Sequence, residues 1–350
     1  MPLATANLNK DDGFLLGLGF KYTGQEGFRK FPYTTIQQLM ITHSFTTDAF
    51  SINYKGEWNK AIGKADLVLQ ALVKAPDNTM NFFGLGNGSD YDRSLDFARY
   101  YRIRFNTYDF NPALRWHTTT GSTFSIGPSI EYYHLNPDEN IGRFINNTSA
   151  IGSYDSTTVN KDRLHAGVIM NFMSDKSNNK IFPSSGIYFN VKLQGYAGLN
   201  TYSKSFAQLI PEIVFYRGIG SDSRLVIAER MGGGITVGQT AFYQSLFLGG
   251  QGNLLGYRQN RFAGQEMVYN NLEARLKLGD LSSYVLPGQF GLSGFYDIGR
   301  VWAKVDQSNT WHQGVGGGFY FAPAGMLVLQ IQAGYSVEGW YPAISFQFRF

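Results

Sequence analysis

The chain has 350 residues, of which 43% are hydrophobic, 16% are aromatic and 16% are charged, and its formal net charge is +4. The 28 Phe, 22 Tyr and 41 Gly residues, together with the low charge, are unusual for a soluble enzyme, in which about 25% of residues are charged. This composition excludes intrinsic disorder, the lack of cysteine excludes a disulfide framework, and the lack of any apolar run of about 20 residues excludes a helical membrane protein.

In chain order, residues 1–12 show neither a signal peptide nor a strand pattern, and we expect them to be an N-terminal tail or a remnant of an excised chain. From residue 13 to residue 350, apolar and polar side chains alternate in segment after segment, which is typical of strands with one apolar face. Splitting this region at Gly, Pro, Asn and Asp clusters predicts sixteen strands. They lie near 14–22, 36–46, 49–58, 65–74, 97–106, 109–119, 122–134, 162–173, 185–196, 204–217, 222–232, 266–278, 288–302, 311–321, 326–336 and 341–350.

The apolar face of these strands is rich in aromatic residues, and the polar face carries glycines and paired charges. A soluble sandwich would need polar outer faces and protected edges. A closed barrel in lipid accounts for both faces, because closure satisfies the backbone and aromatic girdles lie at the membrane interfaces. The prediction is therefore an all-β protein, a sixteen-stranded antiparallel transmembrane β-barrel over residues 13–350, located in the bacterial outer membrane.

The lengths of the connections indicate which end of the barrel is which. Both termini of an even-numbered barrel lie on one side, where turns are short. The connections at 135–161 and 233–265 are long and lie on the opposite side, and we expect the second to fold into the lumen. Residues 75–96 do not fit, because they form a long connection on the side of the short turns. Either this segment enters the barrel mouth or the strands predicted on its two sides are misplaced.

Three stretches are more specific than composition. They are residues 248–264 (LGGQGNLLGYRQNRFAG), 269–276 (YNNLEARL) and 294–302 (GFYDIGRVW). These stretches resemble the C-terminal part of the BamA/TamA superfamily of sixteen-stranded outer-membrane barrels, the bacterial surface antigen family. The NRFAG and YNNLE runs are most similar to members whose barrel follows a periplasmic enzyme domain. The resemblance is strong over residues 185–350 and only architectural before them.

The resemblance implies that the tip of the sixth extracellular loop folds back into the lumen. In the family this tip reads Arg-Gly-Phe/Tyr, and its arginine meets acidic residues on the strands that follow. The matching residues here are Leu255, Gly256 and Tyr257, so leucine stands in place of the arginine. The contact that is usual in the family is therefore not available to this residue.

Two carboxylates are candidates for the luminal partners of the loop. By strand alternation, Glu273 and Asp297 point into the lumen, the latter on the same face as Gly299. A carboxylate in a confined lumen needs a cation or hydrogen-bond donors. We therefore expect Arg258 or Arg261 to replace the family's contact. The alternative is an ordinary network of luminal charges that water screens.

The resemblance also implies a seam between the first and last strands, which in the family opens sideways to admit substrate strands into the membrane or is used for secretion. Glycines in the first strand and Pro342 in the last should weaken pairing there, although the glycines could simply relieve crowding. The residues expected at the seam are Phe14, Leu16, Gly17, Leu18, Gly19 and Phe20 in the first strand and Ile344, Phe346, Phe348 and Phe350 in the last.

The expected function is thus insertion or translocation of polypeptide or lipid at this seam. The expected partners are outer-membrane lipid and an unfolded outer-membrane protein or a secreted polypeptide. Nucleic acid is not expected, because the chain has no basic run. A first alternative is a general porin that prefers anions, since Arg102, Arg104, Lys192, Arg275 and Lys277 are expected to point inward. A second is a membrane anchor for an enzyme domain.

Nothing in the sequence predicts catalysis. The five histidines are scattered through the chain without metal-ligand spacing, and no Gly-x-Ser-x-Gly motif is present. Outer-membrane lipases and proteases are also barrels, but the sequence does not show an assembled set of catalytic groups. We expect no catalytic residue, no cofactor and no metal, and we expect the protein not to be an enzyme.

Overall fold

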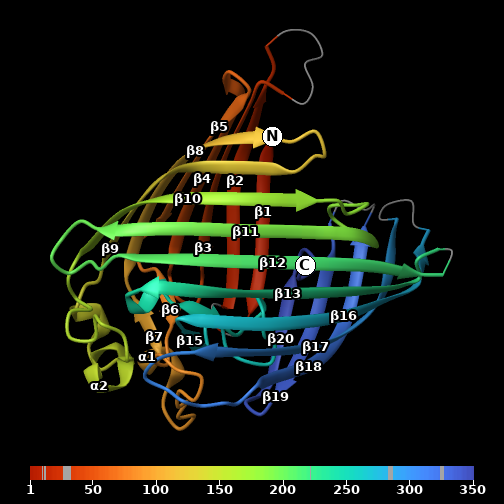
Figure 1. Cartoon of the computed structure of the whole chain (residues 1–350). Coiled ribbons are helices and arrows are strands. Elements are labelled where there is room, and N and C mark those ends of the chain that lie inside the picture. Colours follow the sequence, from red (N-terminus) through yellow and green to blue (C-terminus); the bar gives the residue numbers. More distant parts are fainter. Residues whose placement is uncertain (10, 12, 27–32, 221, 283–286, 324–326) are drawn as a thin grey trace.

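The computed structural model describes residues 1–350 except 10, 12, 27–32, 221, 283–286 and 324–326. Sixteen strands form one closed antiparallel barrel (Figure 1). In order around the barrel they are β1 (Pro2–Asn9), β2 (Gly13–Gly24), β3 (Thr35–Ser44), β4 (Phe50–Ile62), β5 (Ala65–Lys74), β8 (Asn106–His117), β9 (Thr123–His134), β10 (Arg163–Asp175), β11 (Ser185–Gly198), β12 (Phe206–Ile219), β13 (Leu225–Gly238), β16 (Glu266–Leu281), β17 (Gly288–Trp302), β18 (His312–Pro323), β19 (Leu329–Ser336) and β20 (Gly339–Ser345).

The remaining elements are short and lie in the connections between barrel strands. They are β6 (Thr79–Asn81), α1 (Phe97–Tyr100), β7 (Arg102–Arg104), η1 (Asp138–Asn140), η2 (Phe144–Asn146), α2 (Thr148–Ile151), η3 (Phe242–Gln244), β14 (Leu246–Leu248) and β15 (Phe262–Gly264). None of the helices among the described residues has the length and hydropathy needed to cross a membrane.

The predicted number of strands is confirmed, but two errors cancel in that number: one barrel strand was not predicted, and one predicted strand is not part of the barrel. Residues 2–9 are not a tail, because β1 pairs with β2 along its whole length. The strand escaped detection because Ala4 and Ala6 leave it without a large apolar face. Residues 97–106 are not a barrel strand: α1 begins where Asp96 accepts hydrogen bonds from the next turn, and β7 pairs with β6. The barrel therefore spans residues 2–345 rather than beginning at residue 13.

Adding β1 at the start resolves the position of the long connections. Residues 75–105, 135–162 and 239–265 now all leave the barrel at the same end. Of the two strands predicted beside residues 75–96, the one at 65–74 coincides with β5 and the one at 97–106 is misplaced, so the second explanation holds for one strand only. Because outer-membrane barrels have short periplasmic turns and long extracellular loops, this end is extracellular, and both β1 and β20 run between it and the periplasmic end.

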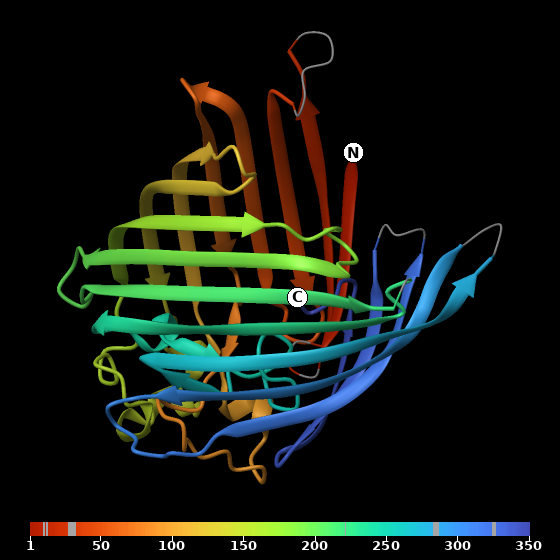
Figure 2. The same cartoon turned by 45° about the vertical axis from the view of Figure 1, so that its right-hand side comes forward.

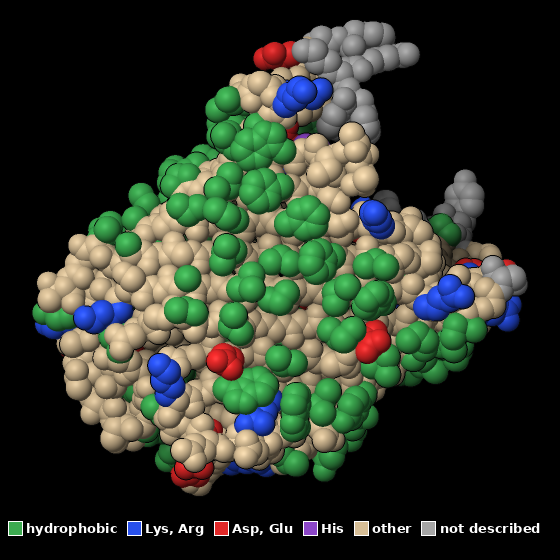
Figure 3. Space-filling model, viewed as in Figure 1, with side chains coloured by type: hydrophobic (Ala, Val, Ile, Leu, Met, Phe, Trp, Pro, Cys, Tyr) green, Lys and Arg blue, Asp and Glu red, His purple; other side chains and the backbone are tan. Residues whose placement is uncertain are grey.

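The barrel wall has an apolar outer face and a mixed inner face. Hydrophobic side chains cover much of the outer face in Figure 3, and Lys and Arg side chains lie mainly toward its margins. Along β17, Leu292 and Tyr296 are exposed on the outside, whereas Ser293, Phe295 and Asp297 are buried on the inside. Lipid is the solvent that suits such an outer face.

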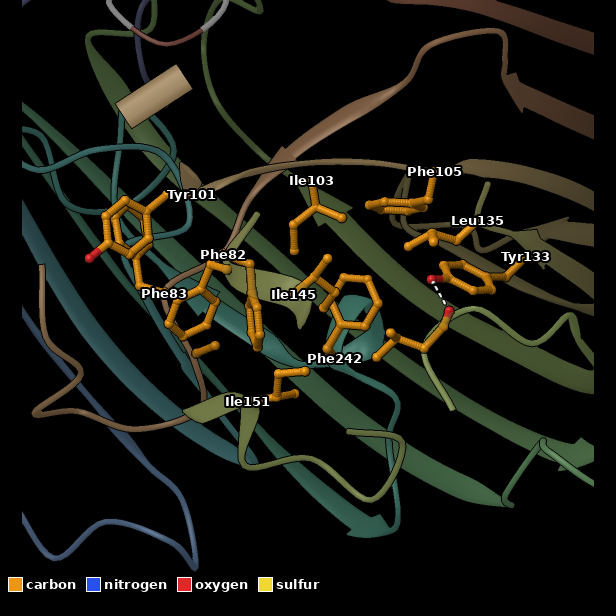
Figure 4. Close-up of a cluster of buried hydrophobic side chains, with 13 residues drawn as sticks. Phe82, Phe83, Tyr101, Ile103, Phe105, Tyr133, Leu135, Ile145, Ile151 and Phe242 are labelled. Carbon is orange, nitrogen blue, oxygen red and sulfur yellow. Dashed lines mark hydrogen bonds between the residues drawn. The ribbon is translucent and has the colours of Figure 1, made fainter. Parts of the chain in front are cut away.

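The three long connections pack together into a cap over the extracellular end. Figure 4 shows its core, which we call the cap cluster, with side chains from all three connections and the adjoining strand ends. Phe242 is fully buried there, and its ring lies 5.3 Å from that of Phe82 and 5.6 Å from that of Phe105. Tyr133 donates a hydrogen bond to the Val159 carbonyl at 2.8 Å. The cap is therefore packed like a protein interior.

The cap cluster yields the first testable prediction. Phe242→Ala should remove a buried ring and lower the stability of the cap by about 3–5 kcal/mol. Amide hydrogen exchange of residues 82–105 measures this as faster exchange. Phe172→Ala on the lipid-facing side of β10 is the control, because that side chain is already 37% exposed. Equal exchange in the two variants would mean that the cap does not depend on this cluster.

Candidate functional site: the seam and the loop tip

The seam lies where β1 meets β20, and it is short. In the described part of the chain, the ladder between these strands comprises two residue pairs, Leu8 with Ile344 and Asn9 with Ala343, whereas β1 and β2 share eight. Both seam pairs lie near the extracellular end, since β1 ends at Asn9 and β20 begins at Gly339. Figure 2 shows the first strand in red beside the last strands in blue.

Below these pairs the seam is open. A cavity of about 780 Å³ lies between residues 4–7 of β1 and residues 345–349. The strand β20 ends at Ser345, so in the described chain residues 2–7 of β1 pair with β2 on one side only. The seam is thus a wedge that is closed at the extracellular end and widens toward the periplasmic end.

The residues expected at the seam need correction. The segment from Phe14 to Phe20 belongs to β2, which pairs with β1 on one side and with β3 on the other. The residues predicted for the first strand therefore lie one strand away from the seam. They are Phe14, Leu16, Gly17, Leu18, Gly19 and Phe20. Of the four predicted residues in the last strand, Ile344 is at the seam. The error follows directly from missing β1.

Residues 346–350, which we call the C-terminal segment, leave the wall and contact inward-facing side chains. Phe348 is buried against Tyr320, with the Phe182 ring of the β10–β11 turn 5.1 Å away. The Arg275 guanidinium carbon lies 3.8 Å from the centre of the Phe348 ring, and the Nη2 group of Arg275 donates a hydrogen bond to the Phe350 backbone oxygen at 2.8 Å. The prediction that Phe346, Phe348 and Phe350 continue the seam strand is wrong, because the segment gains these contacts instead of pairing with β1.

Asp297 is the point where the C-terminal segment meets the loop tip. It is fully buried, and Arg349 binds both of its oxygens, at 2.6 and 3.2 Å. The Leu255 backbone N–H donates to Oδ2 of the same carboxylate at 2.8 Å. The expectation that Arg258 or Arg261 would pair with this carboxylate is wrong, because Arg349 of the C-terminal segment pairs with it instead.

The loop tip contacts the inner wall through its backbone and its apolar side chains. Leu255 is buried in a cluster with Phe295 and Ala343, and Tyr257 packs on Phe262. A Cβ atom at Gly256, which has φ +111°, would come within 3.0 Å of the Tyr335 carbonyl oxygen. Gly256 is therefore required for the close approach of the tip to β19.

Gly299 and Glu273 also have clear structural roles. A Cβ atom at Gly299 would come within 2.8 Å of the Leu248 side chain, so this glycine makes room for the loop. Glu273 is fully buried, as expected for an inward-facing residue, and it pairs with Arg275 of its own strand at 2.7 Å. This pair belongs to the wall network and not to a contact with the loop arginines.

The two loop arginines pair with carboxylates outside the predicted set. Arg258 binds Asp11, in the turn between β1 and β2, at 2.5 Å. Arg261 binds Glu338, in the turn between β19 and β20, at 2.6 Å. Burial alone would lower the pKa of Arg258, but the Asp11 carboxylate and Tyr91 raise it overall.

The cations that were expected to line a pore do not form one set. Arg102 and Arg104 lie in β7, within the cap, and Arg104 pairs with Asp77 at 2.8 Å. Lys192 lines a luminal cavity of about 760 Å³ together with Asp109, Glu131 and apolar side chains. Lys277 pairs with Asp280 at 2.8 Å. The expected inward position is therefore confirmed for Lys192 and Arg275, which lie on the luminal side of the wall. It is wrong for Arg102 and Arg104, because they belong to the cap and not to a wall strand.

Sequence reasoning missed Asp11, Glu338 and Arg349. Asp11 lay in the presumed tail, and Arg349 was assigned to a wall strand because it alternates with phenylalanines. In the described chain, no three or more His, Cys, Asp or Glu side chains gather as metal ligands would. The site is therefore built from ion pairs and strand edges.

The Asp297–Arg349 pair gives the second prediction. Asp297→Asn should lower the free energy of unfolding by about 3–5 kcal/mol, because a buried arginine loses its counter-charge. Urea unfolding, followed by the heat-dependent shift in gel mobility, measures this loss. In a double-mutant cycle, Arg349→Gln should cost much less once Asp297 is replaced. Asp280→Asn is the control, because it breaks an exposed pair and should lower the free energy of unfolding by only about 0–1 kcal/mol. If the losses for the Asp297 and Arg349 variants were strictly additive, the two residues would not be coupled.

Comparisons with known proteins agree with this architecture. A model of the Omp85 superfamily domain matches residues 15–348. Among solved structures, BamA from Haemophilus ducreyi lacking POTRA domains 1–3 aligns with a TM-score of 0.70 and 14% identity, over 99% of this chain and 70% of that one. CdiB from Acinetobacter baumannii aligns with a TM-score of 0.59 and 11% identity, over 99% of this chain and 59% of that one. CdiB from Escherichia coli aligns with a TM-score of 0.59 and 12% identity, over 99% and 63%.

The chain spans less than two thirds of the two CdiB chains. None of the curated proteins compared with it matches. At these identities the solved structures support the fold, and the family follows from the match over residues 15–348. The resemblance found in the sequence is confirmed: this chain belongs to the Omp85 superfamily and is a multi-pass β-barrel of the outer membrane.

Proposed function

We propose that this barrel inserts or translocates polypeptide by letting a substrate strand pair with the open edge of β1. The observation that carries the proposal is the wedge at the seam: residues 4–7 of β1 face a cavity of about 780 Å³, and two residue pairs join β1 to β20 in the described chain. An unpaired strand edge is a template for another strand.

The register at the seam indicates what kind of strand would fit. Leu8 lies opposite Ile344 and Asn9 opposite Ala343. Extending this register places positions 346 and 348 of a continued strand opposite Ala6 and Ala4. Small residues on β1 leave room on the lipid side for large side chains at alternate positions of the incoming strand. An amphipathic strand with large apolar residues on one face is therefore the substrate that suits this edge.

The family expectation points the same way. In barrels that this sequence resembles, the seam between the first and last strands admits substrate strands or serves secretion. The solved relatives BamA and CdiB share the fold with this chain. Polypeptide is thus the substrate class that both the edge geometry and the family favour, with outer-membrane lipid as the surrounding solvent.

A general porin is the weaker candidate. The cap cluster packs three long connections over the extracellular end, and the loop tip and the C-terminal segment both reach Asp297 on the inner wall. These contacts oppose a wide and permanent water channel. The anchor role for a separate domain concerns parts of a longer protein and is compatible with a seam that works in this way.

A disulfide across the seam tests the proposal. The chain has no cysteine, so Leu8→Cys with Ile344→Cys creates one defined bridge between β1 and β20. The assay measures how much the protein, in liposomes, accelerates the insertion of a small unfolded outer-membrane barrel. We expect this acceleration to be at least tenfold smaller for the bridged form, and we expect reduction of the disulfide to restore it. The bridge prevents β1 and β20 from separating while the wall stays intact.

The matched control is Met170→Cys with Leu193→Cys, a pair of opposed residues on β10 and β11 that face the lipid. This bridge should leave the insertion rate unchanged. If the wild-type barrel does not accelerate insertion at all, or if the seam bridge has no effect on it, the proposed function is wrong. A large, steady conductance of the intact barrel in planar bilayers would instead favour the porin.

A further inference from the structure

The two arginines of the loop tip hold the two hairpins that border the seam, one on each side. Arg258 pairs with Asp11 in the β1–β2 turn, and Arg261 pairs with Glu338 in the β19–β20 turn. The two arginines are three positions apart in one loop. The loop tip therefore connects the first hairpin of the barrel to the last.

On the β1 side, the contact is more than a single ion pair. Asp11 is buried, and its second oxygen accepts a hydrogen bond from the Gln259 backbone N–H at 2.7 Å. Arg102 of β7 donates to the Asp11 carbonyl. Arg258 is itself stacked on Phe97, with its guanidinium carbon 3.4 Å from the ring centre. The first hairpin is thus fixed to the loop tip through both side-chain and backbone groups.

On the β20 side, the contact is equally enclosed. The side chains of Arg261 and Glu338 are 5% and 8% exposed. Arg261 also donates to the Ser89 hydroxyl and carbonyl oxygens at 2.8 and 2.7 Å, and it packs on Phe83 at 4.8 Å. Ser336, at the end of β19, donates to the Gly256 carbonyl of the loop. The last hairpin is thus fixed to the same tip.

Both ion pairs lie on the extracellular side of the two ladder pairs of the seam, one close to them and one five positions before Ala343. Asn9, the last paired residue of β1, is two positions from Asp11, and Glu338 directly precedes β20. Because the ladder is so short, the backbone contributes little to holding β1 and β20 together. Charged pairs that are screened from water by aromatic rings are strong compared with exposed ones. The loop arginines therefore add, to the two ladder pairs, contacts that join the loop tip to both hairpins at the extracellular end.

We propose that residues 256–261 form a strap that holds the extracellular end of the seam closed, and that release of Arg258 from Asp11 or of Arg261 from Glu338 is the step that permits the seam to open to its full length. This proposal rests on the proposed function for its biological meaning, because it concerns the regulation of the same seam. Its physical content is independent of any substrate. Separating the two hairpins must break at least one of the two ion pairs or displace the loop.

Spin labels across the seam test the strap without any polypeptide. Phe14→Cys on β2 and Val337→Cys in the β19–β20 turn are exposed positions on the two sides, and pulsed electron paramagnetic resonance in lipid nanodiscs measures the distance between labels attached to them. With the strap intact we expect one narrow distribution. Arg258→Gln and Arg261→Gln should each add a longer distance, with a population of separated hairpins at least tenfold larger than in the parent.

Two further variants separate a strap from a general loss of structure. Arg104→Gln breaks the ion pair with Asp77, which is of similar length, is partly exposed and does not bridge the seam. This variant should leave the distance unchanged. Asp11→Asn should have the same effect as Arg258→Gln, and the two together should add little, since both remove one interaction. The heat-dependent gel shift checks that each barrel is folded, and Glu338→Gln replaces Arg261→Gln if the latter does not fold.

The outcomes of this experiment and of the disulfide test are distinguishable. Unchanged distances in folded variants from both sides of the strap would overturn the strap, even if the seam bridge blocks insertion. A longer distance in the strap variants but not in Arg104→Gln would support the strap, even if the barrel fails to accelerate insertion. A longer distance in Arg104→Gln as well would overturn the strap, because loosening of the whole cap would then explain the change.

Discussion

A strand in a bilayer must pair along both edges, because an unpaired backbone N–H or C=O group in hydrocarbon costs several kcal/mol. Among the residues that the structure describes, this barrel meets that constraint around its wall, whereas residues 2–7 of β1 are paired on one side only. Three other features of the chain are related to this edge of β1. The last strand stops at Ser345, the C-terminal segment finds partners inside the barrel, and the loop tip fastens the extracellular end.

Charge placement inside the barrel links these features. Asp297 receives Arg349 from the C-terminal segment and the Leu255 N–H from the loop tip. The arginine that the family carries at the loop tip is leucine here, so the counter-charge of Asp297 comes from a different part of the chain. The neighbouring Arg258 and Arg261 bind the turns on the two sides of the seam. In this chain, the charges of the loop tip and of the C-terminal segment therefore pair with different carboxylates of the wall and its turns.

Alternation and turn residues were enough to predict the fold class, the number of strands and fifteen segments that overlap wall strands in the structure. They were not enough for β1, because alanines at positions 4 and 6 give no apolar face to detect, nor for residues 97–106, where local alternation belongs to the cap. The buried positions of Glu273 and Asp297 followed from the pleat alone. Their partners did not, because Arg349 and Asp11 reach the site through tertiary contacts that no local spacing encodes.

The C-terminal segment has a consequence for selectivity. Its sequence alternates phenylalanines with polar residues, as a wall strand does, and it is joined directly to β20. If it straightened, it would meet the edge of β1 at an effective concentration in the millimolar range, as short tethers generally provide. Under the proposed function, an incoming strand would compete with the C-terminal segment for the edge of β1, and the ion pair between Arg349 and Asp297 would disfavour that segment by holding it inside the barrel. The strength of this buried ion pair would then set the lowest affinity with which a substrate strand could still displace the C-terminal segment from the edge.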